Sequence, residues 1–97
     1  MSEEMLSEVK KRIETLEKGE KDKYGLLVNR YDEGWLEVLR WFLERKPSLN
    51  DIEKASFIPL IPASWVEKGY VYVDDFDRGC LDALHWLMGL IKQNQTL

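Results

Sequence analysis

The sequence has little that would support catalysis by a thiol or an imidazole. Among its 97 residues there is a single cysteine, Cys80, and a single histidine, His85. One cysteine forms no internal disulfide and supplies no cysteine-based zinc site. Five residues on one helix set two side chains about 140° apart around the axis, so the thiol and the imidazole do not pair. We expect a buried thiol, a histidine at a helix edge, and no enzymatic activity or cofactor.

A basic excess is also lacking, because 14 Lys and Arg stand against 18 Asp and Glu, for a net charge of −4. Proteins that bind nucleic acid or anionic lipid usually carry the opposite balance. No apolar run approaches the roughly 18 residues of a membrane span. The acidic start, Met1 to Glu4, does not resemble a signal peptide. These features favour a cytoplasmic protein with neither a nucleic-acid nor a membrane partner.

Hydrophobic residues make up 44% of the chain and charged residues 33%, which is typical of a globular protein. At this length we expect one domain, 1–97. Its parts are an N-terminal helix and polar hinge over 1–23, a core over 24–92 and a frayed tail over 93–97. The apolar periodicity predicts an all-α fold of four to five helices, with at most a short β element near 70–73.

The first predicted helix covers 3–18 and ends before the hinge Gly19 to Lys23. Its apolar stripe is narrow and suits packing against one partner helix. The second periodic stretch, 24–46, contains Gly25 and Gly34, so it is either one bent helix or two. Asp32 is a candidate cap for its second half. Pro47 ends it, because proline disrupts a helix interior.

The following segment is short and irregular. Ser48 or Asn50 would cap a short helix over 51–56, with Glu53 completing a capping box after Asn50. The remaining predictions here are a buried extended connector over 57–62, a helical turn over 64–68 and the β-prone tetrad 70–73.

The last predicted helix begins at Asp74 or Asp75 and runs to about Lys92. Its apolar arc exceeds 200° by helical geometry, which is unusually wide. Such a helix is either central in the fold or buries a second face against another chain. Its main stripe comprises Phe76, Cys80, Leu81, Leu84, Leu87, Met88 and Ile91.

Four carboxylates precede and enter this helix: Asp74, Asp75, Asp77 and Asp82. The oxygen spacing of a calcium-binding EF-hand loop is not met from Asp75 or from Asp77. The simpler interpretation is that they satisfy helix N-terminal amides, so no metal site is predicted. A weak Mg²⁺ site at Asp75 and Asp77 is the remaining alternative, and it would make the protein a small Mg-dependent enzyme.

The order of elements in the middle of the chain resembles a winged helix. The resemblance covers the span 35–73, about 40 of the 97 residues, and it is carried by 35–46, Pro47, 51–56 and 67–73. It implies a winged-helix-like α+β fold as the alternative architecture and a DNA-binding transcriptional regulator as the alternative function. The segment in the place of the recognition helix, 57–68, has two prolines and few groups that read base edges.

Aromatic residues are over-represented, with four Trp, four Tyr and three Phe. Trp35 and Phe42 have clear core positions, but four other aromatics do not. Interface hot spots are enriched in Trp and Tyr. We therefore expect a small accessory or adaptor protein that acts by protein–protein contact, as a homodimer or as a subunit of a larger assembly. The candidate partner-binding residues are Trp41, Ala83, Trp86, Leu90, Trp65 and Tyr70.

Overall fold

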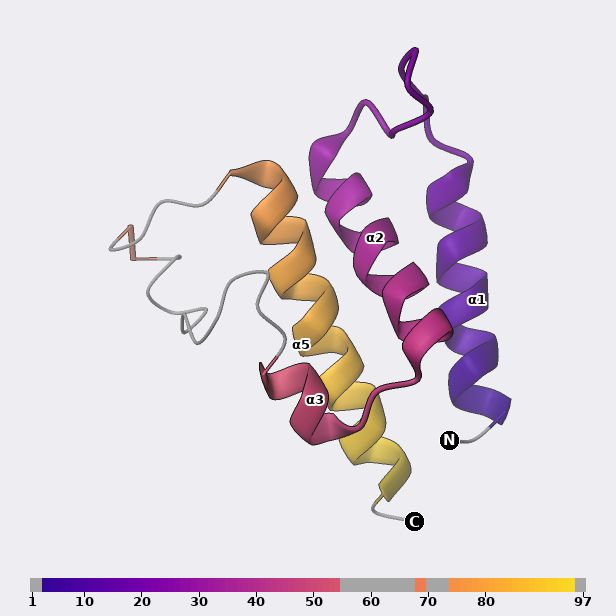
Figure 1. Ribbon diagram of the computed structural model, residues 1–97, viewed down its shortest axis with the longest axis vertical. Helices are drawn as coiled ribbons and strands as arrows, with labels where there is room; N and C mark the ends of the chain where they lie inside the picture. Colours follow the sequence, from indigo (N-terminus) through magenta and orange to yellow (C-terminus); the bar gives the residue numbers. More distant parts are fainter. Residues whose placement is uncertain (1–2, 55–67, 70–73, 96–97) are drawn as a thin grey trace.

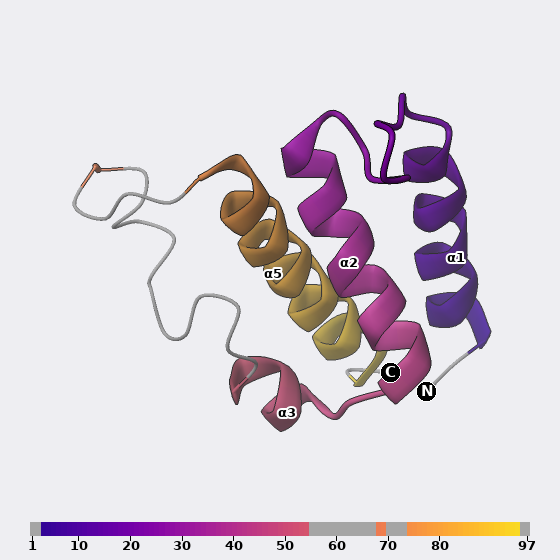
Figure 2. The ribbon, with the colours of Figure 1, turned by 45° about the horizontal axis from the view of Figure 1, so that its top comes forward.

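Helices dominate the computed structural model, which describes residues 3–54, 68–69 and 74–95. In these ranges there are four α-helices: α1 (Glu3–Glu17), α2 (Arg30–Arg45), α3 (Leu49–Lys54) and α5 (Asp75–Gln95). Figures 1 and 2 show α1, α2 and α5 side by side with α2 in the middle, while the short α3 packs against α5. Within the described ranges the only β-type pairing is an isolated bridge between Lys21 and Leu27. The predicted all-α fold class is confirmed.

The apolar stripe of α1 is covered within the chain. Met5, Val9 and Ile13 recur every four residues and are all buried. They face α2, with a smaller contact to α5. The helix ends within one residue of the predicted boundary. Its narrow stripe therefore packs on α2 of the same molecule, and no second chain is needed to cover it.

Helix α2 begins later than the sequence suggested and is a single helix. Its N-cap is Asn29, whose side chain accepts the Asp32 N–H, so the expectation that Asp32 is the cap is wrong. The segment before it forms a turn in which Gly25 has φ of 81°. At the other end Lys46 adopts the left-handed conformation and donates its N–H to the carbonyl of Phe42. The next residue is proline, which prevents the helix from continuing.

Two glycines allow α2 and α5 to touch through their backbones. A Cβ atom on Gly34 would overlap the carbonyl oxygen of Phe76 and lie 2.8 Å from the backbone nitrogen of Cys80. A Cβ atom on Gly79 would overlap the carbonyl oxygen of Tyr31. The Cys80 thiol also donates to the Gly34 carbonyl at 3.5 Å. Gly34 therefore does not interrupt α2 but permits its closest packing contact.

The hydrophobic core lies between α1, α2 and α5, with one residue from α3. Trp35 and Phe42 belong to it, as the sequence indicated. The buried apolar residues beyond those of α1 are Leu27, Trp35, Leu36, Val38, Leu39, Phe42, Ile52, Cys80, Leu81, Ala83, Leu84, Leu87 and Ile91. The wide apolar arc of α5 is thus largely used inside the molecule.

The caps of α3 and α5 are formed by side chains that precede each helix. Ser48 Oγ accepts the Asp51 N–H while Asp51 Oδ2 accepts the Ser48 N–H, both at 3.2 Å. This is a capping box, but it pairs Ser48 with Asp51 and not Asn50 with Glu53 as predicted. In α5 the Asp74 carboxylate accepts the Asp77 N–H at 2.8 Å.

Helix α5 is longer than expected. It continues to Gln95, so the prediction of a frayed tail from residue 93 is wrong for 93–95. Its last turn is reinforced by the Asn94 amide, which donates to the Leu90 carbonyl at 2.8 Å. No helix in the described ranges is both long and apolar enough to cross a membrane.

Several predicted features lie outside the described residues. They are the connector over 57–62, most of the turn over 64–68 and the β element over 70–73. The same holds for the strand and recognition segment of the winged-helix resemblance, and for Trp65 and Tyr70.

The glycine contact gives a direct test of the packing. We expect Gly34→Ala or Gly79→Ala to lower the free energy of unfolding by at least about 2 kcal/mol, because the new methyl group overlaps backbone atoms that have nowhere to move. Gly89 is the matched control, since nothing lies near its Cβ position. Gly89→Ala should raise stability by about 0.5–1 kcal/mol. Urea denaturation of the three variants measures both effects, and equal effects at all three sites would contradict the close contact.

Candidate functional site

The turn between α1 and α2 is held rigidly by its own hydrogen bonds. The Asp22 N–H donates to the Leu26 carbonyl at 2.8 Å, and the Val28 N–H donates to the Glu20 carbonyl at 2.9 Å. The Asp22 carboxylate accepts the backbone N–H groups of Tyr24 and Leu26, at 2.8 and 3.1 Å. These bonds hold the backbone of the turn in one conformation.

Arg30, the first residue of α2, fastens the turn to the helix. Its guanidinium pairs with Asp22 at 2.8 Å and donates to the Leu27 carbonyl at 3.2 Å. Burial acts against ionisation of Asp22, but hydrogen bonds from Tyr24, Leu26 and Arg30 outweigh it and hold the pKa of the carboxyl below its usual value. Leu27 is 1% exposed and anchors the turn in the core.

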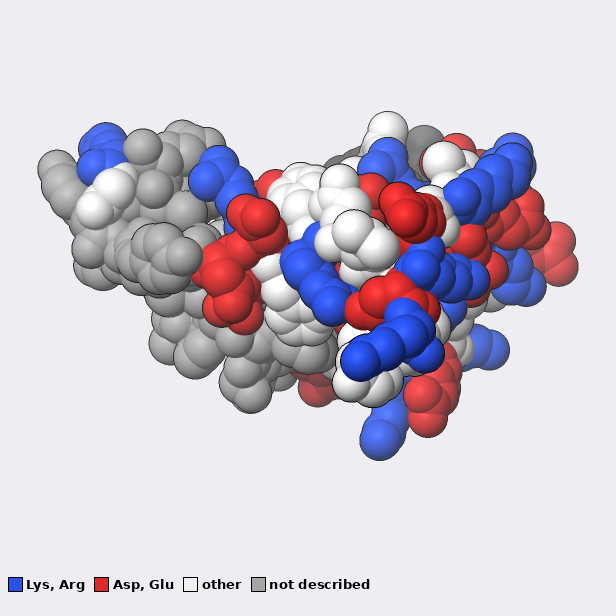
Figure 3. All heavy atoms as spheres, turned by 90° about the horizontal axis from the view of Figure 1, so that it is seen from above, with Lys and Arg blue, Asp and Glu red and all other residues white. Residues whose placement is uncertain are grey.

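Three apolar side chains on this turn point outward. Tyr24 is 75% exposed, Val28 51% and Leu26 38%. We call these three residues the apolar turn. Figure 3 views this end of the molecule and shows uncharged atoms bordered by Asp and Glu on one side and by Lys and Arg on others. Several exposed apolar residues on one ordered segment indicate a candidate interaction surface.

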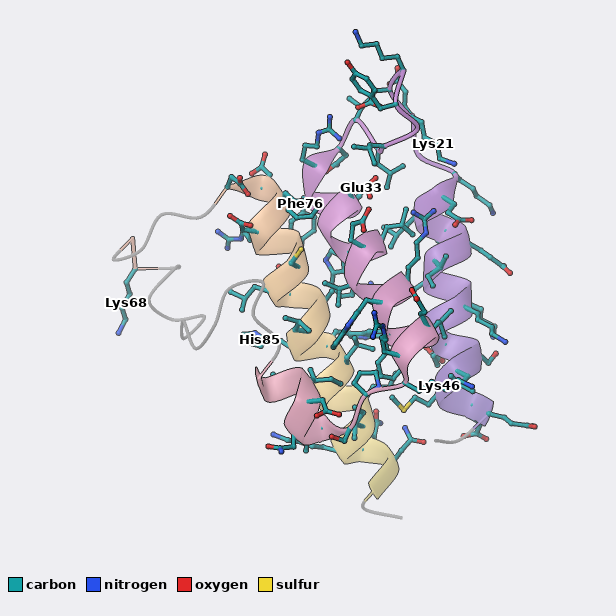
Figure 4. All side chains as sticks on the ribbon, in the orientation of Figure 1. Lys21, Glu33, Lys46, Lys68, Phe76 and His85 are labelled. Atoms are coloured by element: carbon teal, nitrogen blue, oxygen red, sulfur yellow. The ribbon has the colours of Figure 1, made fainter. Side chains whose placement is uncertain are left out.

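An open cleft of about 560 Å³ adjoins the apolar turn, between the first turns of α2 and α5. Figure 4 shows Glu33 near the start of α2 and Phe76 in the first turn of α5, both at this end. We call this space the acidic cleft, because four carboxylates and one guanidinium line it. Its lining residues are Leu26, Arg30, Glu33, Glu37, Asp74, Asp75 and Phe76.

Glu33 is the buried charged residue of this cleft, with only 3% of its surface exposed. One carboxylate oxygen, Oε1, accepts the Leu27 N–H at 2.8 Å and so ties α2 to the turn. The other, Oε2, is buried and has no hydrogen-bond partner in the described part of the chain. Leaving a buried charged acceptor without a donor costs several kcal/mol at most and about 1–3 kcal/mol in typical cases.

The neighbouring Glu37 lies one helical turn further along α2. Burial raises the pKa of its carboxyl above the usual value, and the Glu33 carboxylate raises it further, by repulsion and by accepting a hydrogen bond when Glu37 is protonated. Arg40 acts in the opposite direction. The Glu37 carboxyl therefore holds its proton more tightly than an ordinary glutamate does.

The acidic residues singled out in the sequence do not converge on one point. Asp74 caps α5, while Asp82 accepts the Tyr31 hydroxyl at 2.6 Å. Burial raises the pKa of Tyr31 and the bond to Asp82 raises it further. Among the described residues no three carboxylate, imidazole or thiol groups are arranged to hold a metal ion. The alternative of a weak Mg²⁺ site on the two carboxylates of Asp75 and Asp77 stays a prediction from the sequence.

Trp86 is engaged inside the molecule. Its ring lies 5.8 Å from that of Trp35, at an interplanar angle of 59°. The guanidinium of Arg12, from α1, lies 4.6 Å from the Trp86 ring centroid and 4.8 Å from that of Trp35. This cation–π contact joins all three long helices. The tryptophan expected to be a partner anchor therefore contributes to the packing of its own chain.

Of the other proposed anchors in the described residues, only Leu90 shares a surface with Trp86. Trp41 is half-buried and lies six residues after Trp35, about 120° away around α2, so it faces another side. Ala83 is completely buried. Trp86 and half-buried Leu90 do share a shallow groove of about 390 Å³ between α1 and α5. The six-residue patch predicted from the sequence is therefore divided among the core, two different faces and the undescribed segment.

The Cys80 thiol and the His85 imidazole differ in their exposure to solvent. Cys80 is fully buried, and burial, with repulsion from nearby carboxylates, raises its pKa to about 12. His85 is exposed and projects from α5 at the side of the helix pair (Figure 4). A thiol in this state is a poor nucleophile.

The sequence contains a local signal for the turn before α2. Asp22, Gly25 and Asn29 are turn-forming residue types, and they lie inside a segment interpreted as the start of a helix. Glu33 and Glu37 are spaced by four residues, which places like charges side by side on a helix. Burial of Glu33, however, depends on Leu27 folding back over it, and no local pattern predicts that contact.

Comparisons with protein-family models, with curated proteins and with solved structures find no match for this chain.

The Arg12 contact predicts a measurable contribution to stability. Arg12→Ala should lower the free energy of unfolding by about 1 kcal/mol, because both the cation–π contact and the apolar stem are lost. Arg12→Lys should lower the free energy of unfolding by less than Arg12→Ala does. The control is Lys11→Ala, the exposed neighbour on the same helix. Chemical denaturation followed by tryptophan fluorescence measures these differences, and an equal loss for Lys11→Ala would argue against the contact.

The raised pKa of Glu37 predicts a stability effect that depends on pH. The folded state holds this proton more tightly than the unfolded state, so stability falls as pH rises from about 4.5 through the folded-state pKa. Glu37→Gln removes the charge and supplies an amide donor toward Glu33. The variant should melt a few degrees higher than the wild type at pH 7 and show little gain near pH 4. Thermal unfolding at the two pH values tests this, and a gain of the same size at both would contradict it.

Proposed function

We propose that this chain is a small accessory protein that binds a partner protein through the apolar turn and the acidic cleft beside it. The partner segment would carry both apolar and basic side chains. The observation that carries this proposal is the exposure of Tyr24, Leu26 and Val28 on a turn that hydrogen bonds hold in place.

Rigidity supports a binding role for this turn. Ordering a flexible loop on binding lowers affinity, whereas a preformed surface avoids that cost. Asp22 and Arg30 fix the turn to α2, and Leu27 anchors it from below. An isolated exposed leucine would need no explanation, but three apolar side chains on one fixed turn favour contact with another surface.

The charges of the acidic cleft favour a basic partner group there, whereas on the apolar turn the Lys23 ammonium lies 5.1 Å from the centroid of the Tyr24 ring. Glu33, Glu37, Asp74 and Asp75 line the acidic cleft, while its only cation among the described residues, Arg30, is already paired with Asp22. Such a field attracts and orients a partner with Lys or Arg residues and repels an acidic one. The same field disfavours nucleic acid, so the proposal favours a protein partner over the DNA-binding alternative.

The groove between α1 and α5 is the weaker candidate. Its aromatic member, Trp86, already packs on Trp35 and Arg12. Trp86 and Leu90 are only half-buried, and polar residues make up most of the remaining lining. A cytoplasmic location stays a prediction from the sequence, as does the absence of enzymatic activity.

Site-specific photo-crosslinking in the native host tests the proposal. A benzoylphenylalanine placed at position 24 should crosslink a partner, whereas the same group at Lys10, an exposed site on α1, should not. The partner is then purified and its affinity is measured by calorimetry. Leu26→Ser and Asp75→Asn should each weaken binding by about tenfold, or ~1.4 kcal/mol. Glu14→Gln, an exposed charge change on α1, is the matched control and should have no effect.

Three outcomes would contradict the proposal. One is crosslinking at position 24 only to a second copy of this chain, which would indicate a homodimer. Another is a partner whose binding is unchanged in Leu26→Ser and Asp75→Asn. The third is a partner with an acidic contact surface.

A further inference from the structure

We infer that Glu33 is a binding residue whose Oε2 atom accepts a hydrogen bond from the ammonium or guanidinium group of a partner's lysine or arginine side chain, inserted into the acidic cleft. This inference rests on the proposed function, because it names the chemistry by which the same site would recognise its partner. It adds a specific acceptor and a specific class of ligand group.

The first observation is the unsatisfied oxygen. Glu33 is 97% buried, its Oε1 is committed to the Leu27 N–H, and its Oε2 has no donor in the described part of the chain. A buried carboxylate oxygen is normally hydrogen-bonded. Glu33 lines the acidic cleft but Oε2 itself is covered, so a donor that enters the cleft reaches this oxygen only after a small shift of the surrounding side chains. Lys and Arg side chains are cationic donors of the kind that such an oxygen binds most strongly.

The second observation is that the nearest internal cation is already occupied. Arg30 lines the same cleft, but its two terminal nitrogens bond to Asp22 and to the Leu27 carbonyl. Reassigning it to Glu33 would release the turn that Glu33 itself helps to hold. Arg30 is thus held on the turn, and Glu33 Oε2 is left available to an external donor.

The third observation is the shape and lining of the cleft. Leu26 and half-buried Phe76 provide apolar walls, and the carboxylates of Glu37 and Asp75 lie on the same lining. An aliphatic stem fits against apolar walls while its charged end reaches a carboxylate. The carboxylates are not arranged tightly enough for a metal ion within the described residues, and an organic cation with a longer reach suits that spacing.

The competing occupant is a proton shared between Glu33 and Glu37. In that case the pair satisfies itself, and the cleft has no special affinity for a cation. The two possibilities differ in whether a small organic cation binds the cleft at pH 7, so the test adds such a cation to the protein.

The experiment is a ¹H–¹⁵N NMR titration with n-butylammonium, which has the side chain of lysine without a backbone. Its neutral control is n-butanol. We expect saturable shifts centred on the amides of Leu27, Glu33 and Phe76 with the cation and not with the alcohol. Glu33→Gln should weaken the binding by about tenfold or more, because it removes a charge-assisted bond. Its carbonyl oxygen still accepts the Leu27 N–H, so the fold is retained.

A second arm identifies the source of the cation. Acetyl-Leu-Lys-Leu-amide should bind more tightly than n-butylammonium, because its leucines contact the apolar turn. It should also bind more tightly than 1,5-diaminopentane, which represents a free polyamine, and than the peptide with norleucine in place of lysine. Tighter binding of the diamine than of the lysine peptide would overturn the assignment to a protein side chain.

The failures of the two proposals are distinguishable. If the lysine and norleucine peptides shift Tyr24, Leu26 and Val28 equally and n-butylammonium causes no saturable shift, the role of Glu33 is overturned and the proposed binding surface stands. If n-butylammonium binds with full dependence on Glu33 but the crosslinking partner is insensitive to Leu26→Ser and Asp75→Asn, the cation site stands while the proposed function fails. Shifts spread evenly over all acidic residues, or unchanged in Glu33→Gln, would overturn the inference.

Discussion

The backbone contact between α2 and α5 is the constraint on which the rest of this structure depends. Gly34 and Gly79 remove the side chains that would hold the two helices apart. Because Gly34 meets the first turn of α5, the residue before it, Glu33, and the residue one turn later, Glu37, are brought beside the acidic start of that helix. The acidic cleft is therefore a consequence of close packing, because the two glycines at the crossing bring four carboxylates to the lining of one cleft.

The start of α2 has a second task, which is to hold the turn before it. Asn29 caps the helix, Arg30 holds Asp22, and Glu33 accepts the Leu27 N–H. Three polar residues at the helix start are thus used to fix a segment that has almost no regular secondary structure. The apolar turn keeps its shape because a helix terminus supplies the hydrogen bonds that a sheet would supply elsewhere.

Helical periodicity was enough to predict the fold class and most helix positions. The apolar spacing of α1, the position of Pro47 and the cap at Asp74 are local features, and each boundary follows from residues close in sequence. The start of α2 was misplaced because Asn29 and Asp32 are both good caps. The choice between them depends on how the preceding turn packs against the first residues of the helix. The candidate site was not predicted, since burial of Glu33 and exposure of Tyr24 both depend on that same packing. Aromatic composition pointed to Trp86, but its pairing with Trp35 and Arg12 is a tertiary contact between three helices.

Cys80 lies inside the glycine crossing, where its thiol contacts the Gly34 carbonyl. With a pKa of about 12 and no exposed surface, this thiol meets no reagent while the helices remain together. Any modification of Cys80 in the folded protein must therefore wait for α2 and α5 to separate. The rate at which a thiol reagent labels Cys80 in the native chain consequently measures how often α2 and α5 separate. Cys80 is a natural residue of the chain, so this measurement needs no added probe.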